Sequence, residues 1–263
     1  MRFLAAALLL LSPAAQAQWT IVDESPAVDP NSPLTYQRKV VSRKGESGFF
    51  SAKRIDLVWF NAKTHSFRVI DNGGNNEAIF PDLVTAMKKN GCLAGCNGGF
   101  FLENDQPSGL MISSGNETGK FGSGSLLSGV LLSSGKRNPY LLRRAEYGSA
   151  YKPTDLIQAG PFLVDQGVTV RGLSPQNSRR RTFVLHDGDQ WFAIGLCDAL
   201  TLALLGEVLA HPEFSPNRKI HRALNLDGGT SSGFFFDRGD RAEPLHVEPF
   251  KKVRNYVGIV PRS

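Results

Sequence analysis

The sequence is organised as a succession of short apolar runs, each closed by turn residues. The runs are rich in β-branched and aromatic residues, a pattern typical of buried β-strands. They lie at Arg54–Phe60, Phe67–Ile70, Leu126–Leu132, Pro139–Leu142, Leu156–Val164, Thr182–Leu185, Ala223–Leu226 and Tyr256–Val260. The strands do not alternate with helices, which argues against a βαβ architecture. We therefore expect the α+β class, as a single compact domain of mixed β-sheets with a few flanking helices.

Two pairs of runs predict β-hairpins. The first pair is Arg54–Phe60 and Phe67–Ile70, which a short polar loop connects. The second is Thr182–Leu185 and Trp191–Ile194, whose loop contains Asp187-Gly188. Asp-Gly tolerates the positive φ of a tight turn, so the second hairpin is the more strongly indicated.

Two segments predict helices. Pro81–Asn90 begins with a proline that suits a first helical turn, and it is followed by Gly91, which suits the C-terminal cap. Leu202–Ala210 carries an apolar stripe, with Thr201 as the expected N-cap and His211-Pro212 as the end.

The N-terminus predicts export. Met1-Arg2 supplies a positive charge, Phe3–Leu11 is apolar, and Ala15-Gln16-Ala17 is a small-x-small cleavage site. The apolar stretch is well short of the roughly 20 residues that span a bilayer, so we expect a signal peptide rather than a membrane span. We therefore expect a periplasmic or secreted protein.

Three segments of the chain follow from these patterns. Residues 1–17 are the expected signal peptide, and residues 18–48, rich in Pro, Ser and Asp, predict an irregular arm. Residues 49–263 form the expected folded domain.

Charge and cysteine content limit the partners. The net charge of +6 is spread along the chain, which favours an anionic small molecule or glycan over nucleic acid.

Cys92, Cys96 and Cys197 are an odd number for an exported chain, and the sequence leaves their pairing open. No histidine stands at a ligand-like spacing from them, so we expect no structural metal. We also expect no cofactor, and the sequence leaves open whether the activity depends on a metal. The oligomeric state is also left open.

Two glycine-rich segments stand out as candidates for a site. They are Asn97-Gly98-Gly99-Phe100-Phe101 and Asn225-Leu226-Asp227-Gly228-Gly229-Thr230-Ser231-Ser232, and each follows an apolar run. Paired glycines let the backbone turn close to a ligand and present N–H groups to an anion. Each segment alone would also fit a tight turn with local hydrogen bonds.

Charged residues near these segments complete the candidate set. Arg181 opens a predicted strand and suits a phosphate, because a guanidinium presents forked donors. Its neighbours Arg179 and Arg180 are interpreted as a solvated charge run. Glu103 and Asp105 follow the first glycine pair and suggest a divided acid and base role, although exposed loop acids are the commoner case.

Taken in order, these segments resemble the phosphodiester glycosidase family from about Arg54 to Pro261. The elements are Asn97–Phe101, Gln106–Leu110, Ala159–Val164, Arg181-Thr182, the helix near Thr201 and Ala223–Ser232. The Gln106–Leu110 element is similar to a bacterial exported branch of the family.

The resemblance implies hydrolysis of a sugar-1-phosphodiester between the anomeric carbon and phosphate. Asp227 would act as general base on water or stabilise a cationic sugar, Asn97 would orient the substrate, and Glu103 would be a second carboxylate. The residues expected to bind the substrate or its phosphate are Arg181, Gly98, Gly99, Asn225, Gly228, Gly229, Thr230 and Ser231.

Two other functions remain open at this point. The same scaffold could bind an anionic cell-envelope glycan without chemistry, because fold and reaction are separable. A third possibility is a glycoside hydrolase that acts on neutral glycan. Loss of Arg181 would not affect the activity of such an enzyme.

Overall fold

The computed structural model describes residues 19–25, 32–43, 52–74, 77–135, 138–239 and 242–262. Within these residues the chain is dominated by β-sheet, with two α-helices and four short 3₁₀ helices. The expected signal peptide, residues 1–17, lies outside the described residues. No described helix is long and apolar enough to cross a membrane.

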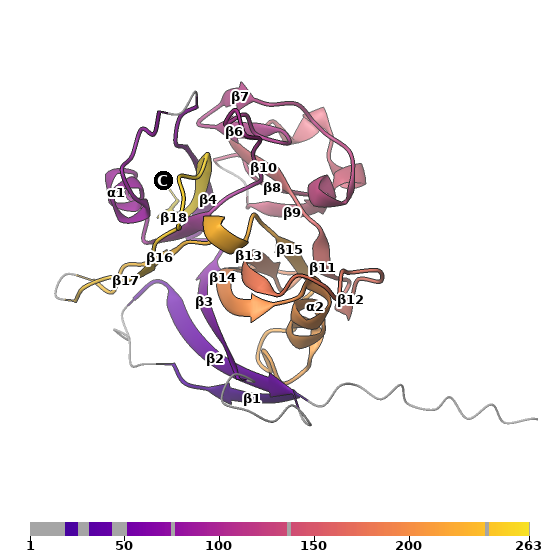
Figure 1. The fold of residues 1–263 in the computed structure, drawn as a ribbon. Coiled ribbons are helices and arrows are strands. Elements are labelled where there is room, and N and C mark those ends of the chain that lie inside the picture. Colours follow the sequence, from indigo (N-terminus) through magenta and orange to yellow (C-terminus); the bar gives the residue numbers. More distant parts are fainter. Residues whose placement is uncertain are drawn as a thin grey trace, which may run out of the picture.

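The strands form three sheets in the described part of the chain (Figure 1). The large sheet has the order β1-β2-β3-β14-β13-β15-β11-β12, with β1 Trp19–Asp23, β2 Thr35–Arg43, β3 Lys53–Asn61, β14 Trp191–Leu200, β13 Arg179–His186, β15 Arg222–Asn225, β11 Phe162–Asp165 and β12 Val168–Thr169. The second sheet has the order β7-β6-β10-β8-β9, with β7 Asn116–Thr118, β6 Met111–Ser113, β10 Asp155–Ala159, β8 Gly129–Ser133 and β9 Tyr140–Arg143. The third has the order β17-β16-β5-β18-β4, with β17 Leu245–Val247, β16 Phe234–Phe236, β5 Ala94–Asn97, β18 Asn255–Pro261 and β4 His65–Asp71.

The helices lie on the outer faces of these sheets or in the connections. They are α1 Leu83–Lys89, α2 Leu202–Ala210, η1 Ser125–Leu127, η2 Arg144–Glu146, η3 Ser149–Tyr151 and η4 Gly229–Ser231. Both predicted α-helices are confirmed. Thr201 caps α2 by accepting the Leu204 N–H at 3.2 Å, as its sequence position predicts.

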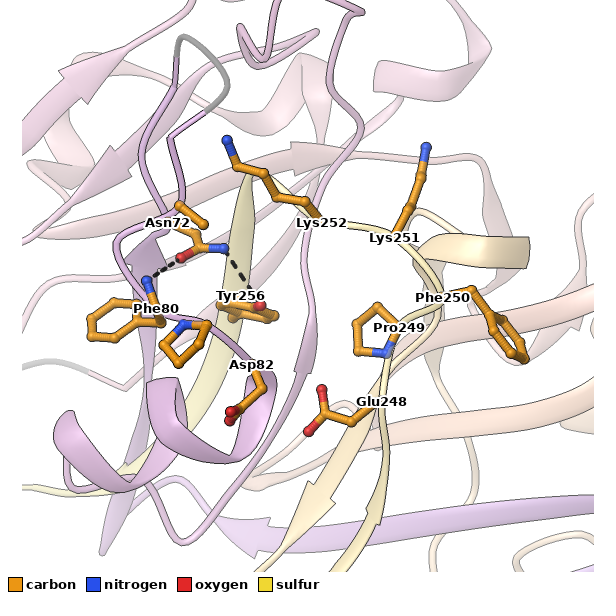
Figure 2. Close-up of a pocket in the computed structure, with 11 residues that line it drawn as sticks. Asn72, Phe80, Asp82, Glu248, Pro249, Phe250, Lys251, Lys252 and Tyr256 are labelled. Carbon is orange, nitrogen blue, oxygen red and sulfur yellow. Dashed lines mark hydrogen bonds between the residues drawn. The ribbon is translucent and has the colours of Figure 1, made fainter.

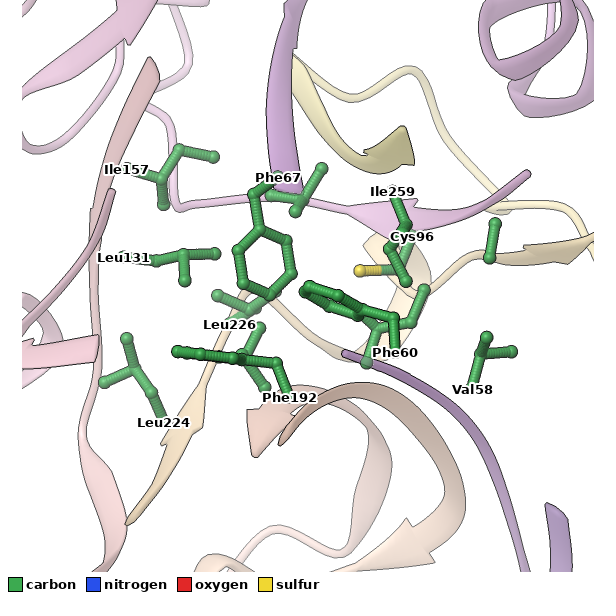
Figure 3. Packing of buried hydrophobic residues seen from close by; sticks show 14 of the residues in the cluster. Val58, Phe60, Phe67, Cys96, Leu131, Ile157, Phe192, Leu224, Leu226 and Ile259 are labelled. Carbon is green, nitrogen blue, oxygen red and sulfur yellow. The ribbon is translucent and has the colours of Figure 1, made fainter. Parts of the chain in front are cut away.

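The core explains why the predicted strands are continuously apolar. One cluster of buried side chains fills the space between the three sheets, and Figure 3 shows Phe60, Phe67 and Phe192 packed at its centre. A second cluster lies between the opposite face of the large sheet and α2. Successive strand residues point to opposite faces, so Val184 enters the first cluster while Phe183 enters the second. Central strands of the large sheet are therefore apolar on both faces.

Three expectations about the strands need correction. The hairpin of Thr182–Leu185 with Trp191–Ile194 is confirmed as β13 and β14, but β3 and β4 do not pair. β3 lies between β2 and β14, whereas β4 pairs with β18 in the third sheet. The rings of Phe60 and Phe67 pack edge to face in the core, with their centroids 4.9 Å apart. The two strands therefore bury these rings against each other from different sheets. The sheets are also not mixed, since every described strand pairing is antiparallel.

The third correction concerns residues 18–48, predicted to be irregular. Their described part forms β1 and β2, which extend the large sheet from β3. Tyr36 and Val41 of β2 are buried. Pairing with a strand already in the sheet supplies the backbone hydrogen bonds that local sequence pattern does not reveal.

The three cysteines are buried and free. Burial raises the pKa of the Cys92 thiol to about 12 and of the Cys197 thiol to about 12. These thiols are therefore protonated and unreactive in the folded protein.

Candidate functional site

The structure brings the two glycine-rich segments together. Asn97 ends β5, and Asp227 follows β15, 130 positions later in the chain. The Asp227 N–H donates to the Gly98 carbonyl at 3.1 Å, and Asn97 Nδ2 donates to the Asp227 carbonyl at 2.7 Å. The third sheet and the large sheet are thus joined at this point.

Asn97 serves as the connector rather than as a pocket residue. Its side chain is 1% exposed. Its Oδ1 accepts from Thr182 Oγ1 at 2.7 Å and from the Gly233 N–H at 3.0 Å. With Nδ2 also bonded to the Asp227 carbonyl, both the nitrogen and the oxygen of the amide are engaged inside the protein, so the side chain holds the Asp227 segment in place.

A pocket of about 470 Å³ opens in front of Asp227. Its cationic walls come from two segments, because Arg179 and Arg180 lie at the start of β13 and Lys251 lies in the connection before β18. The remaining lining residues are Gly228, Gly229, Thr230, Ser231 and Phe250. Three side-chain cations around one carboxyl group suit an anionic ligand.

Burial and polar contacts have opposite effects on the pKa of the Asp227 carboxyl group. Burial raises its pKa above the ordinary value, while interactions with the Ser231 hydroxyl, the Gly228 N–H and the Lys251 charge lower it, with a net rise. The Gly228 N–H donates to Asp227 Oδ1 at 2.8 Å. A carboxyl group with a raised pKa in a cleft is suited to proton transfer.

The segment after Asp227 offers further polar atoms to the pocket. Ser231 is 1% exposed, and its hydroxyl faces the Asp227 carboxyl group, whose pKa it lowers. In the described part of the chain, the N–H groups of Gly229 and Thr230 have no hydrogen-bond acceptor. An anion seated here would supply acceptors for these donors.

The structure corrects the assignment of the arginine. Arg181 does not line the pocket: its Nε donates to the Leu200 carbonyl at 3.1 Å and its Nη2 to the Asn177 carbonyl at 2.6 Å. The pairing of β13 with β14 shifts register between Arg179 and Arg181. Such an irregularity breaks strict alternation, so Arg179 and Arg180 both reach the pocket.

The first glycine pair also differs from expectation. The Gly98 N–H donates to the Asn255 carbonyl at 3.0 Å, and the Gly99 N–H donates to Asn255 Oδ1 at 2.7 Å. Both glycines are buried, and a Cβ at Gly98 would overlap Asn255 Oδ1 and Ile157. The pair therefore allows close packing and does not bind phosphate through its N–H groups.

Two further predicted site residues lie outside the pocket. Glu103 is exposed on the loop after β5 and does not line the cavity at Asp227. Asn225 is buried, and its Nδ2 donates to the carbonyl groups of Gly160 and Leu226 at 2.9 and 2.7 Å. Asn225 thus holds the Asp227 segment against the chain before β11, whereas Thr230 and Ser231 remain at the pocket.

Sequence reasoning missed Lys251, Phe250 and Asn255. The Phe250 side chain is 74% exposed, and the Arg180 guanidinium lies 5.0 Å from its ring centroid. Lys251 Nζ lies 4.8 Å from the Phe101 ring centroid. The signal for this segment was Phe250-Lys251-Lys252, an aromatic residue next to two lysines just before a strand.

Comparison with solved structures shows the fold. The chain is similar to the zebrafish N-acetylglucosamine-1-phosphodiester alpha-N-acetylglucosaminidase catalytic domain, auto-inhibited by its pro-peptide, with a TM-score of 0.61, 17% identity, and coverage of 92% of this chain and 88% of that one. A hypothetical protein from Synechocystis gives a TM-score of 0.56 at 15% identity, covering 93% of this chain and 68% of that one. A putative exported protein from Burkholderia pseudomallei gives 0.50 at 11% identity, covering 85% and 77%.

Comparison of sequences shows the family. No curated protein matches the chain. The family model described as phosphodiester glycosidase matches residues 90–260, which include both glycine-rich segments, the arginines of β13 and the segment before β18. The chain therefore belongs to the phosphodiester glycosidase family.

Proposed function

We propose that this protein hydrolyses sugar-1-phosphodiesters between the anomeric carbon and the phosphate. The observation that carries the proposal is the position of Asp227, a part-buried carboxyl group with a raised pKa that shares one pocket with Arg179, Arg180 and Lys251. The family and the similar zebrafish enzyme support the same class of reaction.

The cations act on the phosphate. Arg179, Arg180 and Lys251 surround a space in which a phosphodiester anion is attracted, and the N–H groups of Gly229 and Thr230 add neutral donors. Negative charge grows on the phosphate as the bond to the anomeric carbon breaks. Cations that face this charge therefore stabilise the transition state more than the bound substrate.

Asp227 acts on the other side of the breaking bond. As a carboxylate it takes a proton from water while the water oxygen bonds to the anomeric carbon, or it stabilises positive charge at that carbon. The phosphate monoester leaves with the bonding electrons. Phosphate is a good leaving group without prior protonation, so the reaction does not require Glu103 as a second carboxylate.

The position of Glu103 favours one alternative. Glycosidases ordinarily use two carboxyl groups, and only Asp227 among the predicted acids lines this pocket. A non-catalytic protein that binds anionic glycan would need the cations and the exposed Phe250 ring, but no second acid.

We also propose that the protein is exported. The proposal depends on the signal-peptide pattern of residues 1–17. The N-terminus of the protein recovered from the periplasm or medium tests it: a mature chain that begins at Gln18 is expected, and an uncleaved cytoplasmic chain would refute it.

The test of activity uses the purified chain from Gln18 onward. It is incubated with 1-phosphodiesters of N-acetylglucosamine, glucose, galactose and mannose, and the released reducing sugar is measured. We expect release from at least one of them and a loss of about a thousandfold or more in kcat for Asp227→Asn.

Asp237→Asn is the matched control, because Asp237 follows β16 and lies outside the lining of the pocket. Release of no sugar, together with binding of the diesters by the wild-type protein, would refute hydrolysis and support the glycan-binding alternative.

A further inference from the structure

A second pocket of about 270 Å³ lies next to the one at Asp227. The two pockets share Phe250 and Lys251 as lining residues. These residues belong to residues 248–252, which we name the strap. Figure 2 shows the strap on one side of the second pocket, Phe80 and Asp82 on the other, and Tyr256 between them. A ligand bound at Asp227 can therefore extend past the strap into a separate space.

The strap is a fixed wall between the pockets. The Phe250 N–H donates to the Thr230 carbonyl at 2.8 Å, which ties the strap to the segment after Asp227. Glu248 accepts the Leu83 N–H at 3.0 Å and so ties the strap to α1. The spacing of the two pockets is therefore set by the fold.

The floor of the second pocket offers the phenol hydroxyl of Tyr256. The Asn72 amide beside it is already used, with Nδ2 donating to the Val253 carbonyl at 3.0 Å and Oδ1 accepting the Phe80 N–H at 2.9 Å. Tyr256 is buried, and among the described residues its phenol oxygen accepts one long hydrogen bond of 3.5 Å, from Asn72 Nδ2 (Figure 2). Burial raises the pKa of Tyr256, and the charges of Glu248 and Asp82 raise it further. The phenol therefore remains a hydrogen-bond donor over the whole physiological range.

The charges around this pocket oppose a second anion. Asp82 and Glu248 both line it. Lys252 also lines it but is paired with Asp105 at 3.0 Å, which leaves its charge largely balanced. Lys251 lines both pockets, and its charge is assigned above to the phosphate in the pocket at Asp227. The second pocket thus combines a phenol and two carboxylates with two lysines whose charges are engaged elsewhere, whereas the pocket at Asp227 is lined by three cations.

We infer that the second pocket binds the uncharged, hydroxyl-bearing group attached to the far oxygen of the phosphate and selects against a second phosphoryl group. The inference rests on the proposed function, with the phosphate at Arg179, Arg180 and Lys251. Hydroxyl groups of the ligand donate to Asp82 and Glu248 and accept from Tyr256. The volume lies below the usual range of ligand pockets, about 300 to 1,000 Å³, so the pocket holds one small group such as a polyol.

The test compares three derivatives of one sugar 1-phosphate: the methyl ester, the glycerol ester and the uridine diphosphate sugar, which is a phosphoanhydride with a second phosphoryl group. The sugar is the one released fastest in the panel described above. In the wild-type protein we expect kcat/KM to be highest for the glycerol ester and lowest for the nucleotide sugar. Tyr256→Phe removes only the phenol oxygen, and we expect the glycerol-to-methyl ratio of kcat/KM to fall about fivefold through KM.

A second variant tests the charge. Asp82→Asn keeps the N-cap of α1, where Oδ1 accepts the Thr85 N–H at 2.6 Å, because Asn caps as well as Asp. We expect the nucleotide-sugar-to-methyl ratio of kcat/KM to rise about threefold. Tyr151→Phe, in η3, is the matched control for both ratios.

The outcomes separate the inference from the proposed function. Ratios that neither Tyr256→Phe nor Asp82→Asn changes, in proteins that hydrolyse the methyl ester, overturn the inference alone. A nucleotide sugar hydrolysed faster than the glycerol ester by the wild-type protein also overturns it. Hydrolysis of no ester at all overturns the proposed function and the inference with it.

Discussion

Asn97 Nδ2 donates a hydrogen bond of 2.7 Å to the main-chain oxygen of Asp227, and the same amide accepts from Thr182 and Gly233. One buried side chain thus connects β5, β13 and the two segments around η4. This connection places the Asp227 carboxyl group, because Asp227 lies beyond the end of β15. The candidate site therefore depends on contacts between sheets.

Asn97→Ala should destabilise the fold and misplace Asp227. The change leaves the Thr182 hydroxyl, the Gly233 N–H and the Asp227 carbonyl without their buried partner. We expect the free energy of unfolding to fall by about 3 kcal/mol, measured by urea denaturation. Asn116→Ala, at an exposed position of β7, is the control. An effect no larger than that of the control would contradict the role given to Asn97.

The activity should have an acid limb set by Asp227. A protonated carboxyl group cannot accept a proton from water, so kcat/KM rises with pH through the Asp227 pKa. Burial raises that pKa, so the midpoint should lie above the ordinary value of about 3.9 for Asp. A pH profile of kcat/KM measures it, and a midpoint at or below the ordinary value would refute the assignment.

Asp227→Asn should stabilise the protein at neutral pH. Because the folded-state pKa is raised, the folded protein binds this proton more tightly than the unfolded chain does, and stability decreases as pH rises through the interval between the two pKa values. Asp227→Asn has no titrating group at this position, so its stability does not show this decrease with rising pH. Its gain in free energy of unfolding should be small at pH 3 and larger at pH 7, as followed by thermal and urea unfolding. A variant less stable than the wild type at pH 7 would count against a raised pKa.

Arg180 and Arg181 should give opposite phenotypes although they are adjacent. Arg180 lines the pocket, so Arg180→Ala should raise KM for a phosphodiester about tenfold with little change in stability. Arg181 donates to two carbonyl groups, at Leu200 and Asn177, so Arg181→Ala should lower the free energy of unfolding by about 2 kcal/mol. Steady-state kinetics and urea denaturation of both variants decide the matter. The reverse pattern would restore Arg181 as the ligand contact.

Gly98→Ala should be destabilising because of space alone. A Cβ there would overlap Asn255 Oδ1 and Ile157, whereas a Cβ at Gly148 meets no atom within 4 Å. We expect Gly98→Ala to lower the free energy of unfolding by about 2 kcal/mol and Gly148→Ala to leave it nearly the same. Equal stability of the two variants would show that the 97–99 segment is less tightly packed than described.

Local pattern was sufficient for several elements. The cap of α2 by Thr201 and the Asp187-Gly188 turn between β13 and β14 depend on neighbouring residues, so the sequence predicts them. β1 and β2 were missed because they form by pairing with β3, a long-range interaction. The separation of β3 from β4 was missed for a similar reason, since the turn between them is compatible with one sheet or with two.

The sequence by itself determined two candidate segments, because paired glycines beside Asn97 and Asp227 are a local signal. Of these two, only the segment that begins at Asp227 lines the pocket, and Asn97 holds it in place from outside. Only the tertiary structure decided which side chains face the ligand. A register shift between Arg179 and Arg181 turns Arg180 toward the pocket and Arg181 into the protein. Pairing register and burial arise from contacts between distant strands, and single-strand periodicity does not contain them.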